Sequence, residues 1–359
     1  MRSIPHSSQD PSLPAKPAAA FGWIGFGAVA ITTFSLVTGF VIGLLSTASA
    51  RADTPDNGNN TTTEPAVQAG AEEMAEPGGD VIRKFDVVYD PETGRAGKCD
   101  IYLPAPADIA PVNPGSPDPS PKTNDRPAVV VVHGGGWMSG DKWTMYSHCN
   151  ALAKRGHVVI SINYRLAPEH KFPAQVDDVR KALLWLDDHA SELKVDLNRV
   201  GLFGYSAGGH LSALVAVVAD ESPEIRQRSS DWAVDDARWD RLPKIKAVCA
   251  GGPPCDFREL PPENTSLAYF LGGSRRQVPE IYRAASPTAL ASTGDPPIHI
   301  IHGGDDFLVP VTTSRSFVAA LRDQGVECQL TELPKLGHLM TFMDQRTKQT
   351  MIRWFEKML

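Results

Sequence analysis

Val200-Gly201-Leu202-Phe203-Gly204-Tyr205-Ser206-Ala207-Gly208 is the stretch that decides the fold of this chain. Residues 200–203 form an apolar run that predicts a short buried strand, and residues 209–218 predict a helix. The turn between them has the pattern Gly-x-Ser-x-Gly, in which the backbone bends so sharply that glycine is needed two residues before and two residues after the serine. We therefore expect Ser206 to stand exposed at the end of a sheet.

On both sides of this turn, apolar runs and helical spacings alternate along the chain. Strands are predicted at 81–90, 98–103, 128–133, 158–163, 200–203, 245–250, 297–302 and 327–333, and helices at 143–155, 174–193, 209–218, 312–323 and 346–358. Strands separated by helices pair in parallel through right-handed crossovers, while the turn at 90–94 predicts an antiparallel first pair. The expected fold class is α/β, with a mostly parallel eight-stranded sheet and helices on both faces.

The composition is ordinary for a globular protein. Of the 359 residues, 42% are hydrophobic and 21% are charged, which fits one α/β domain with extensions. The net charge of −7 offers no basic surface for nucleic acid, so no nucleic-acid partner is expected.

The first 50 residues differ from the rest in charge. Residues 18–50 contain no Asp, Glu, Lys or Arg, and the apolar run 21–45 exceeds the roughly 20 residues that a bilayer crossing needs. Ala48-Ser49-Ala50 resembles a cleavage site and favours a signal peptide, whereas the length of the run favours an uncleaved signal anchor. Arg2 and Lys16 precede the run, which predicts that the N-terminus stays inside and that the remainder is exported, either free or tethered through 21–45.

Three further segments lack the pattern of a folded core. Residues 51–79 are rich in small and polar residues and predict a disordered linker, so the folded domain is expected at 80–359. Residues 105–126 are rich in proline and predict a surface loop. The charged segment 220–244, with Trp232 and Trp239, is either a solvated insertion or a cover over the end of the sheet near Ser206.

Ser206 needs partners before it can act as a nucleophile. A serine hydroxyl requires an adjacent base, and a third group orients that base. In an elbow of this kind the partners follow in the order acid and then histidine. His338, between the last strand and the last helix, is the candidate base, and the acid is Asp305 or Asp306, which follow the strand at 297–302. Adjacent side chains point in different directions, so only one can face His338; His302 comes too early and is expected to be structural.

A second glycine motif follows the strand at 128–133, in His133-Gly134-Gly135-Gly136-Trp137. Glycines allow backbone N–H groups to approach a developing negative charge without interference from side chains. The HGGG-type motif predicts an oxyanion hole formed by the N–H groups of Gly135 and Gly136, together with that of Ala207 at the positive end of its helix.

Other side chains leave alternatives open. Trp137 and Tyr205 are candidates to line a substrate pocket, although a packing role suits Trp137 equally well. Cys249 and Cys255 could pair outside the cytoplasm, or they could be buried thiols. No CxxC or His/Cys cluster has the spacing of metal ligands, so neither a metal nor another cofactor is expected.

These motifs together resemble the α/β-hydrolase esterases of the hormone-sensitive-lipase-like group, and within it the bacterial feruloyl-esterase-like (BD-FAE) branch. The matching pieces are HGGGW at 133–137, NYRLAPE at 163–169, FPAQ at 172–175, GYSAGGH at 204–210 and HGGDD at 302–306. The resemblance covers roughly 81–358. It implies the α/β-hydrolase fold with little or no cap, and it implies Asp306 as the acid, because the family places that acid four residues after the histidine.

The expected function is that of a serine carboxylesterase with the triad Ser206, His338 and Asp306. The substrate would be a small-molecule or carbohydrate-linked ester, such as an acetyl or feruloyl ester, and the resemblance implies no cofactor. The alternatives are an exported serine peptidase, an arylformamidase-like amide hydrolase, and a non-catalytic binding module. A binding module would not need nucleophile, base, acid and oxyanion donors together.

Overall fold

The computed structural model describes residues 81–105 and 125–359. The predicted signal or anchor segment 1–50, the linker 51–79 and most of the Pro-rich segment 105–126 lie outside the described residues. In the part of the chain that is described, no helix combines the length and the apolar character needed to cross a membrane.

A single sheet organises residues 81–105 and 125–359, and its strands follow the order β1-β2-β4-β3-β5-β6-β7-β8. The strands are β1 (Ile82–Val88), β2 (Lys98–Leu103), β3 (Arg126–Val132), β4 (Val158–Ile162), β5 (Val195–Tyr205), β6 (Ile245–Gly251), β7 (Ile298–Gly303) and β8 (Cys328–Leu333). β2 pairs antiparallel with both β1 and β4, and the other pairs are parallel. The predicted eight-stranded, mostly parallel sheet is confirmed.

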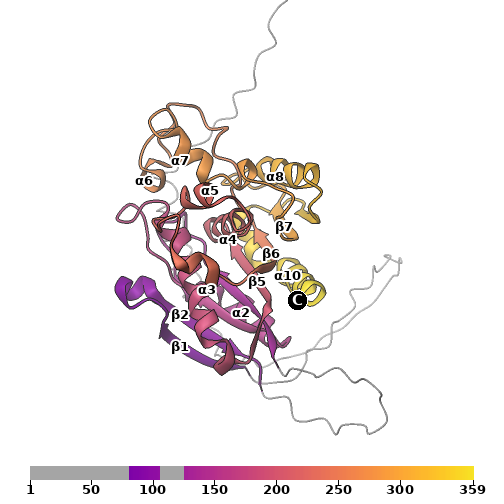
Figure 1. Ribbon diagram of the computed structural model, residues 1–359. Coiled ribbons are helices and arrows are strands. Elements are labelled where there is room, and N and C mark those ends of the chain that lie inside the picture. Colours follow the sequence, from indigo (N-terminus) through magenta and orange to yellow (C-terminus); the bar gives the residue numbers. More distant parts are fainter. Residues whose placement is uncertain (1–80, 106–124) are drawn as a thin grey trace, which may run out of the picture. The chain divides into compact units, whose positions relative to one another are not determined.

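Helices cover both faces of this sheet, as predicted (Figure 1). α2 (Tyr146–Ala153) and α10 (Gln345–Met358) pack on one face against side chains such as Val129, Val131 and Phe203. Successive side chains of a strand point to opposite faces, so the intervening residues face the second layer. That layer consists of α3 (Ala174–Leu193), α4 (Ala207–Val218) and α8 (Val311–Asp323). α4 is buried along its whole length, which explains its continuous apolar sequence.

Several boundaries differ from those predicted. The helix predicted at 143–155 is a 3₁₀ turn, η2 (Lys142–Met145), followed by α2. β5 begins at Val195 rather than at residue 200, because the polar residues Asp196, Asn198 and Arg199 interrupt the apolar pattern. Short elements without a readable period were not predicted: η1 (Pro91–Gly97), α5 (Pro223–Gln227), η3 (Ala237–Arg241), α6 (Ala268–Leu271), α7 (Pro279–Ala284), η4 (Pro287–Ala289) and α9 (His338–Met343). The five cysteines are free thiols, so Cys249 and Cys255 do not pair.

The segment 220–244 is packed against α3. Trp232 and Trp239 are only 4% and 7% exposed, and both contact Leu184 of α3. Arg180 of α3 extends this contact, because its guanidinium donates to the carbonyl and the hydroxyl of Ser229 at 2.6 and 2.8 Å. The two tryptophans are therefore not solvated, and they attach the segment to α3.

Arg180 also forms a buried ion pair with Asp177 at 3.0 Å, with both side chains 2% exposed. Removing one partner of such a pair leaves a buried charge and costs about 3–5 kcal/mol. We expect Arg180→Met to lower the free energy of unfolding in urea by about 3 kcal/mol, the low end of this range, because Ser230 and Asp231 still donate to Asp177.

Arg238 provides the matched control for this change. Its guanidinium lies over Trp232 at 4.2 Å and pairs with Asp236, but its side chain is 41% exposed. An exposed ion pair contributes about 0–1 kcal/mol, so Arg238→Met should cost less than about 1 kcal/mol. Equal losses in the two variants would show that the buried pair does not anchor this segment.

Candidate active site

Ser206 sits in a strained turn between β5 and α4. Its φ is 56°, a left-handed value that costs an ordinary residue about 1–3 kcal/mol. A β-carbon at Gly204 would overlap the carbonyl oxygen of Gly208, and one at Gly208 would overlap that of Val132. The predicted need for glycine on both sides of the serine is confirmed. The amide of Ser206 donates to the Gly251 carbonyl of β6 at 2.7 Å, which anchors the turn to the sheet.

His338 is the first residue of α9, in the connection that follows β8. Its ring lies over the end of β6, since a methyl group at Gly252 would stand 3.0 Å from Cε1. Nδ1 donates to Oδ2 of Asp306 at 2.6 Å. Nε2 is buried and has no hydrogen-bond partner among the described residues. The imidazole therefore has one nitrogen bonded to a carboxylate and one nitrogen free.

Asp306 holds its carboxylate in a fully buried position after β7. Oδ1 accepts hydrogen bonds from the amides of Leu308 and Val309 at 3.0 and 2.8 Å. Burial alone would raise the pKa of Asp306, but hydrogen bonds with His302 and His338 outweigh burial and hold this pKa well below its usual range. The carboxylate is therefore ionised at neutral pH. The neighbouring Asp305 is exposed and does not bond to His338.

His302 lies beneath this carboxylate. It is fully buried, its Nε2 donates to the Val309 carbonyl at 2.8 Å, and its Nδ1 accepts from the hydroxyl of Ser314 at 2.7 Å. The same Nε2 lies 3.3 Å from Oδ2 of Asp306. The expectation of a structural histidine agrees with this arrangement, but its contact with the acid has no signal in the sequence.

Tyr205 and Trp137, the predicted candidates to line a substrate pocket, are both buried. Tyr205 is 4% exposed and its hydroxyl donates to the backbone carbonyl of His338 at 2.6 Å. Trp137 is 3% exposed, stacks on Phe270 at 4.3 Å, and donates from Nε1 to Nδ1 of His210 at 3.2 Å. Both side chains are therefore buried against other protein groups, and their part in lining a substrate pocket stays a prediction.

The glycine loop after β3 carries two unusual backbone angles. Gly135 has φ +120° and Gly136 has φ +61°, and a β-carbon at Gly135 would overlap the carbonyl oxygen of Ser139. Within residues 81–105 and 125–359, neither glycine amide donates a hydrogen bond to another protein group. Ala207 is the first residue of α4, where helical N–H groups lack intrahelical partners. The amides predicted as oxyanion donors thus include two that are free to bind a ligand.

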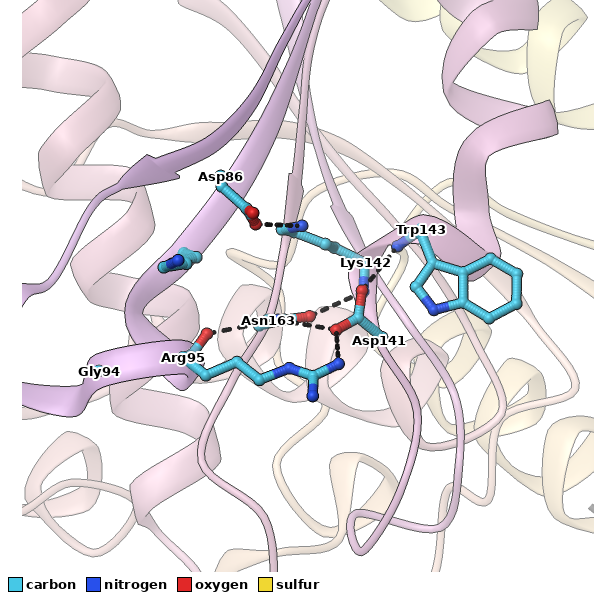
Figure 2. Close-up of a pocket in the computed structure, with 8 residues that line it drawn as sticks. Asp86, Gly94, Arg95, Asp141, Lys142, Trp143 and Asn163 are labelled. Atoms are coloured by element: carbon cyan, nitrogen blue, oxygen red, sulfur yellow. Dashed lines mark hydrogen bonds and ion pairs between the residues drawn. The ribbon is translucent and has the colours of Figure 1, made fainter. Parts of the chain in front are cut away.

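The far end of the glycine loop is fixed in a polar cavity of about 600 Å³ (Figure 2). Oδ1 of Asn163 accepts from the Lys142 amide at 2.7 Å, and Nδ2 of Asn163 donates to Asp141 at 3.1 Å. The ammonium group of Lys142 pairs with Asp86 and Asp100, each at 2.9 Å. Ser206 does not line this cavity, and the protein's own ion pairs cross it. The hydrogen bonds and ion pairs around this cavity therefore hold the end of the loop in place. The sequence did not predict these contacts.

Comparison with known sequences finds ester hydrolases. The family model BD-FAE matches residues 118–321, which is more than half of the chain. Esterase LipC of Mycobacterium tuberculosis is 33% identical over 233 residues, covering 62% of this chain and 55% of LipC. The probable carboxylic ester hydrolase LipM of the same organism is 29% identical over 272 residues, covering 72% and 56%. The chain spans about half the length of these relatives.

Solved structures share the fold. A truncated carbohydrate esterase from gut microbiota is similar with a TM-score of 0.65 and 24% identity, over 77% of this chain and 96% of that one. At this identity the likeness establishes the fold alone. The propionate-bound esterase Est2 of Thermogutta terrifontis has a TM-score of 0.58 and 26% identity, over 79% and 96%. The expected α/β-hydrolase fold is confirmed.

Proposed function

The chain belongs to the BD-FAE family, and on that premise we propose that it is a serine carboxylesterase acting through an acyl-enzyme intermediate. The hydrogen bond between His338 Nδ1 and Asp306, with the buried Nε2 left free, carries the proposal. An imidazole that donates from Nδ1 to a carboxylate presents a basic Nε2, which is the arrangement that a serine nucleophile requires. The ester hydrolase names of the relatives support the same reaction.

Each residue has a defined part in the proposed reaction. Ser206 attacks the ester carbonyl while Nε2 of His338 takes the hydroxyl proton. His338 then gives this proton to the leaving alcohol. Asp306 holds the imidazole in its tautomer and stabilises the imidazolium. The N–H groups of Gly135, Gly136 and Ala207 bind the oxyanion, and water releases the acid from Ser206 in the second half of the cycle.

We propose short-chain or aryl esters as the substrate class, including acetyl or feruloyl esters on carbohydrate. The propionate bound to the Thermogutta terrifontis esterase supports the short-chain part of this range. For the natural chain we further propose export, supported by the uncharged segment 18–50. N-terminal sequencing tests the mode: a mature start at Arg51 supports a signal peptide, and a membrane-bound product that retains 21–45 supports an anchor.

The test of the proposed reaction is hydrolysis of p-nitrophenyl esters from acetate to palmitate by the full chain. We expect the highest kcat/KM on acetate to butyrate, and covalent labelling by a fluorophosphonate on the peptide that contains Ser206. Labelling without ester hydrolysis would direct attention to amide substrates. Absence of both would favour the non-catalytic binding module.

A further inference from the structure

Three consecutive carbonyl groups in the glycine loop each accept a hydrogen bond from a side chain. The donors are His133 Nδ1 to Gly134 at 2.7 Å, Ser139 Oγ to Gly135 at 3.0 Å, and Tyr269 OH to Gly136 at 2.8 Å. Two of these donors lie within the loop, whereas Tyr269 comes from α6 in the connection between β6 and β7. These hydrogen bonds matter because glycines have no side chains of their own with which to hold a backbone conformation.

Peptide geometry links each anchored carbonyl to an amide. A trans peptide unit is planar, and its N–H points opposite to its C=O. Fixing the Gly135 carbonyl therefore fixes the direction of the Gly136 N–H. The amides of Met138 and Ser139 also donate to this carbonyl, at 3.2 and 3.0 Å, and hydrogen bonds to a carbonyl strengthen its peptide as a donor on the other side.

Gly136 is held from both sides in this way. The peptide plane before its Cα is fixed through Ser139, and the plane after it is fixed through Tyr269. These two planes define φ and ψ of Gly136, whose φ of +61° is one of the conformations that a free glycine would visit among many. Loss of the Tyr269 bond would release the plane after Cα and widen the range of φ and ψ at Gly136. Loss of the Ser139 hydroxyl would still leave the amides of Met138 and Ser139 on the Gly135 carbonyl.

The position of Tyr269 is set by its neighbour. Phe270 stacks on Trp137 with an interplanar angle of 4°, and its carbonyl accepts from the Phe172 amide at 2.9 Å. This docking brings the phenol of Tyr269 to the glycine loop from a distant part of the chain. Burial raises the pKa of Tyr269, so the phenol remains protonated and able to donate at neutral pH.

We propose that Tyr269 is a positioning residue that holds φ and ψ of Gly136 and so keeps the N–H of Gly136 aimed at the oxyanion. The proposal rests on the proposed function, because it assigns a donor of that same site. It requires that Tyr269 act on the transition state and not on substrate binding, since the oxyanion exists only after attack on the carbonyl.

The experiment compares Tyr269→Phe and Ser139→Ala with the unchanged chain on p-nitrophenyl acetate. Loss of a complete oxyanion donor costs about 10²–10³ in kcat, so loosening one donor should cost about 10-fold in Tyr269→Phe. Ser139→Ala should lose less, because the amides of Met138 and Ser139 still hold the Gly135 carbonyl. KM should stay within about twofold. Inhibition by an alkyl trifluoromethyl ketone, whose carbonyl adds the serine oxygen to form an oxyanion, should weaken by the same factor as kcat/KM falls.

Tyr282→Phe is the matched control. Its hydroxyl also donates to a glycine carbonyl, that of Gly273 at 3.1 Å, within the same connection, but it does not contact the glycine loop. This control should lose stability without loss of kcat or of ketone affinity. If the unchanged chain hydrolyses acetate while Tyr269→Phe keeps kcat and ketone affinity within twofold, the positioning proposal is overturned and the esterase proposal stands. If the unchanged chain neither hydrolyses esters nor binds the ketone, the proposed function itself fails.

Discussion

Replacing Ser206 with alanine is expected to lower kcat for p-nitrophenyl acetate by about 10⁶-fold, the largest effect of any single change in this chain. The reason is that Ser206 carries the aliphatic hydroxyl of the elbow between β5 and α4, where φ of 56° and the flanking glycines fix its place, while the hydroxyl of Tyr205 is bonded to the His338 carbonyl. The residual rate would come from the oxyanion donors and from binding alone. Steady-state kinetics combined with fluorophosphonate labelling measures both the rate and the loss of the labelled site.

Ser212→Ala is the control for this change. Ser212 lies on the same helix, α4, and its hydroxyl is buried without a hydrogen-bond partner among the described residues. The same substitution there should leave kcat within about twofold. Circular dichroism and thermal unfolding establish that both variants are folded. Retention of activity in Ser206→Ala would remove Ser206 from the mechanism.

Patterns between neighbouring residues predicted the strands, helix α3 and the serine turn, because the conformation of these elements depends mainly on residues close together in the sequence. Apolar runs predicted the central strands β3, β4 and β6, because a parallel sheet buries both faces of such strands. Helix α3 was predicted with its observed bounds, Ala174–Leu193, since its apolar residues recur at helical spacing. The Gly-x-Ser-x-Gly pattern predicted the elbow because any β-carbon at Gly204 or Gly208 would overlap a backbone carbonyl oxygen, so both positions require glycine.

Contacts between distant parts of the chain could not be predicted in this way. Tyr269 meets Gly136 across 133 residues, and Asn163 meets Asp141 across 22. Nothing in the spacing or composition of either segment specifies these distances. The same holds for the buried surroundings of Trp137, because an aromatic residue next to a glycine loop suits packing and ligand binding equally. The stacking of Phe270 on Trp137, which shows a packing contact, is visible only in the structure.

Asp306→Asn is expected to lower kcat by about 10⁴-fold, the cost of the wrong histidine tautomer in serine hydrolases. Oδ1 of Asp306 accepts two backbone N–H groups, from Leu308 and Val309. In the variant these two N–H donors require an acceptor, so the amide oxygen takes the place of Oδ1 and the NH₂ group points toward His338. A donor that faces Nδ1 of His338 requires Nδ1 to be the acceptor, so the imidazole proton moves to Nε2. A protonated Nε2 cannot accept the proton of Ser206.

Asp305, the neighbouring carboxylate, provides the matched control for Asp306→Asn. Asp305→Asn changes the same charge one residue away, on an exposed side chain that does not contact His338, and it should keep kcat within about twofold. Asp306→Asn should leave KM nearly unchanged, because the acid acts on the imidazole and not on the bound ester. Thermal unfolding of both variants separates the tautomer effect from loss of fold. The opposite ranking, with Asp305→Asn the slower variant, would transfer the role of acid to Asp305 and contradict the reading of the 2.6 Å bond as the catalytic one.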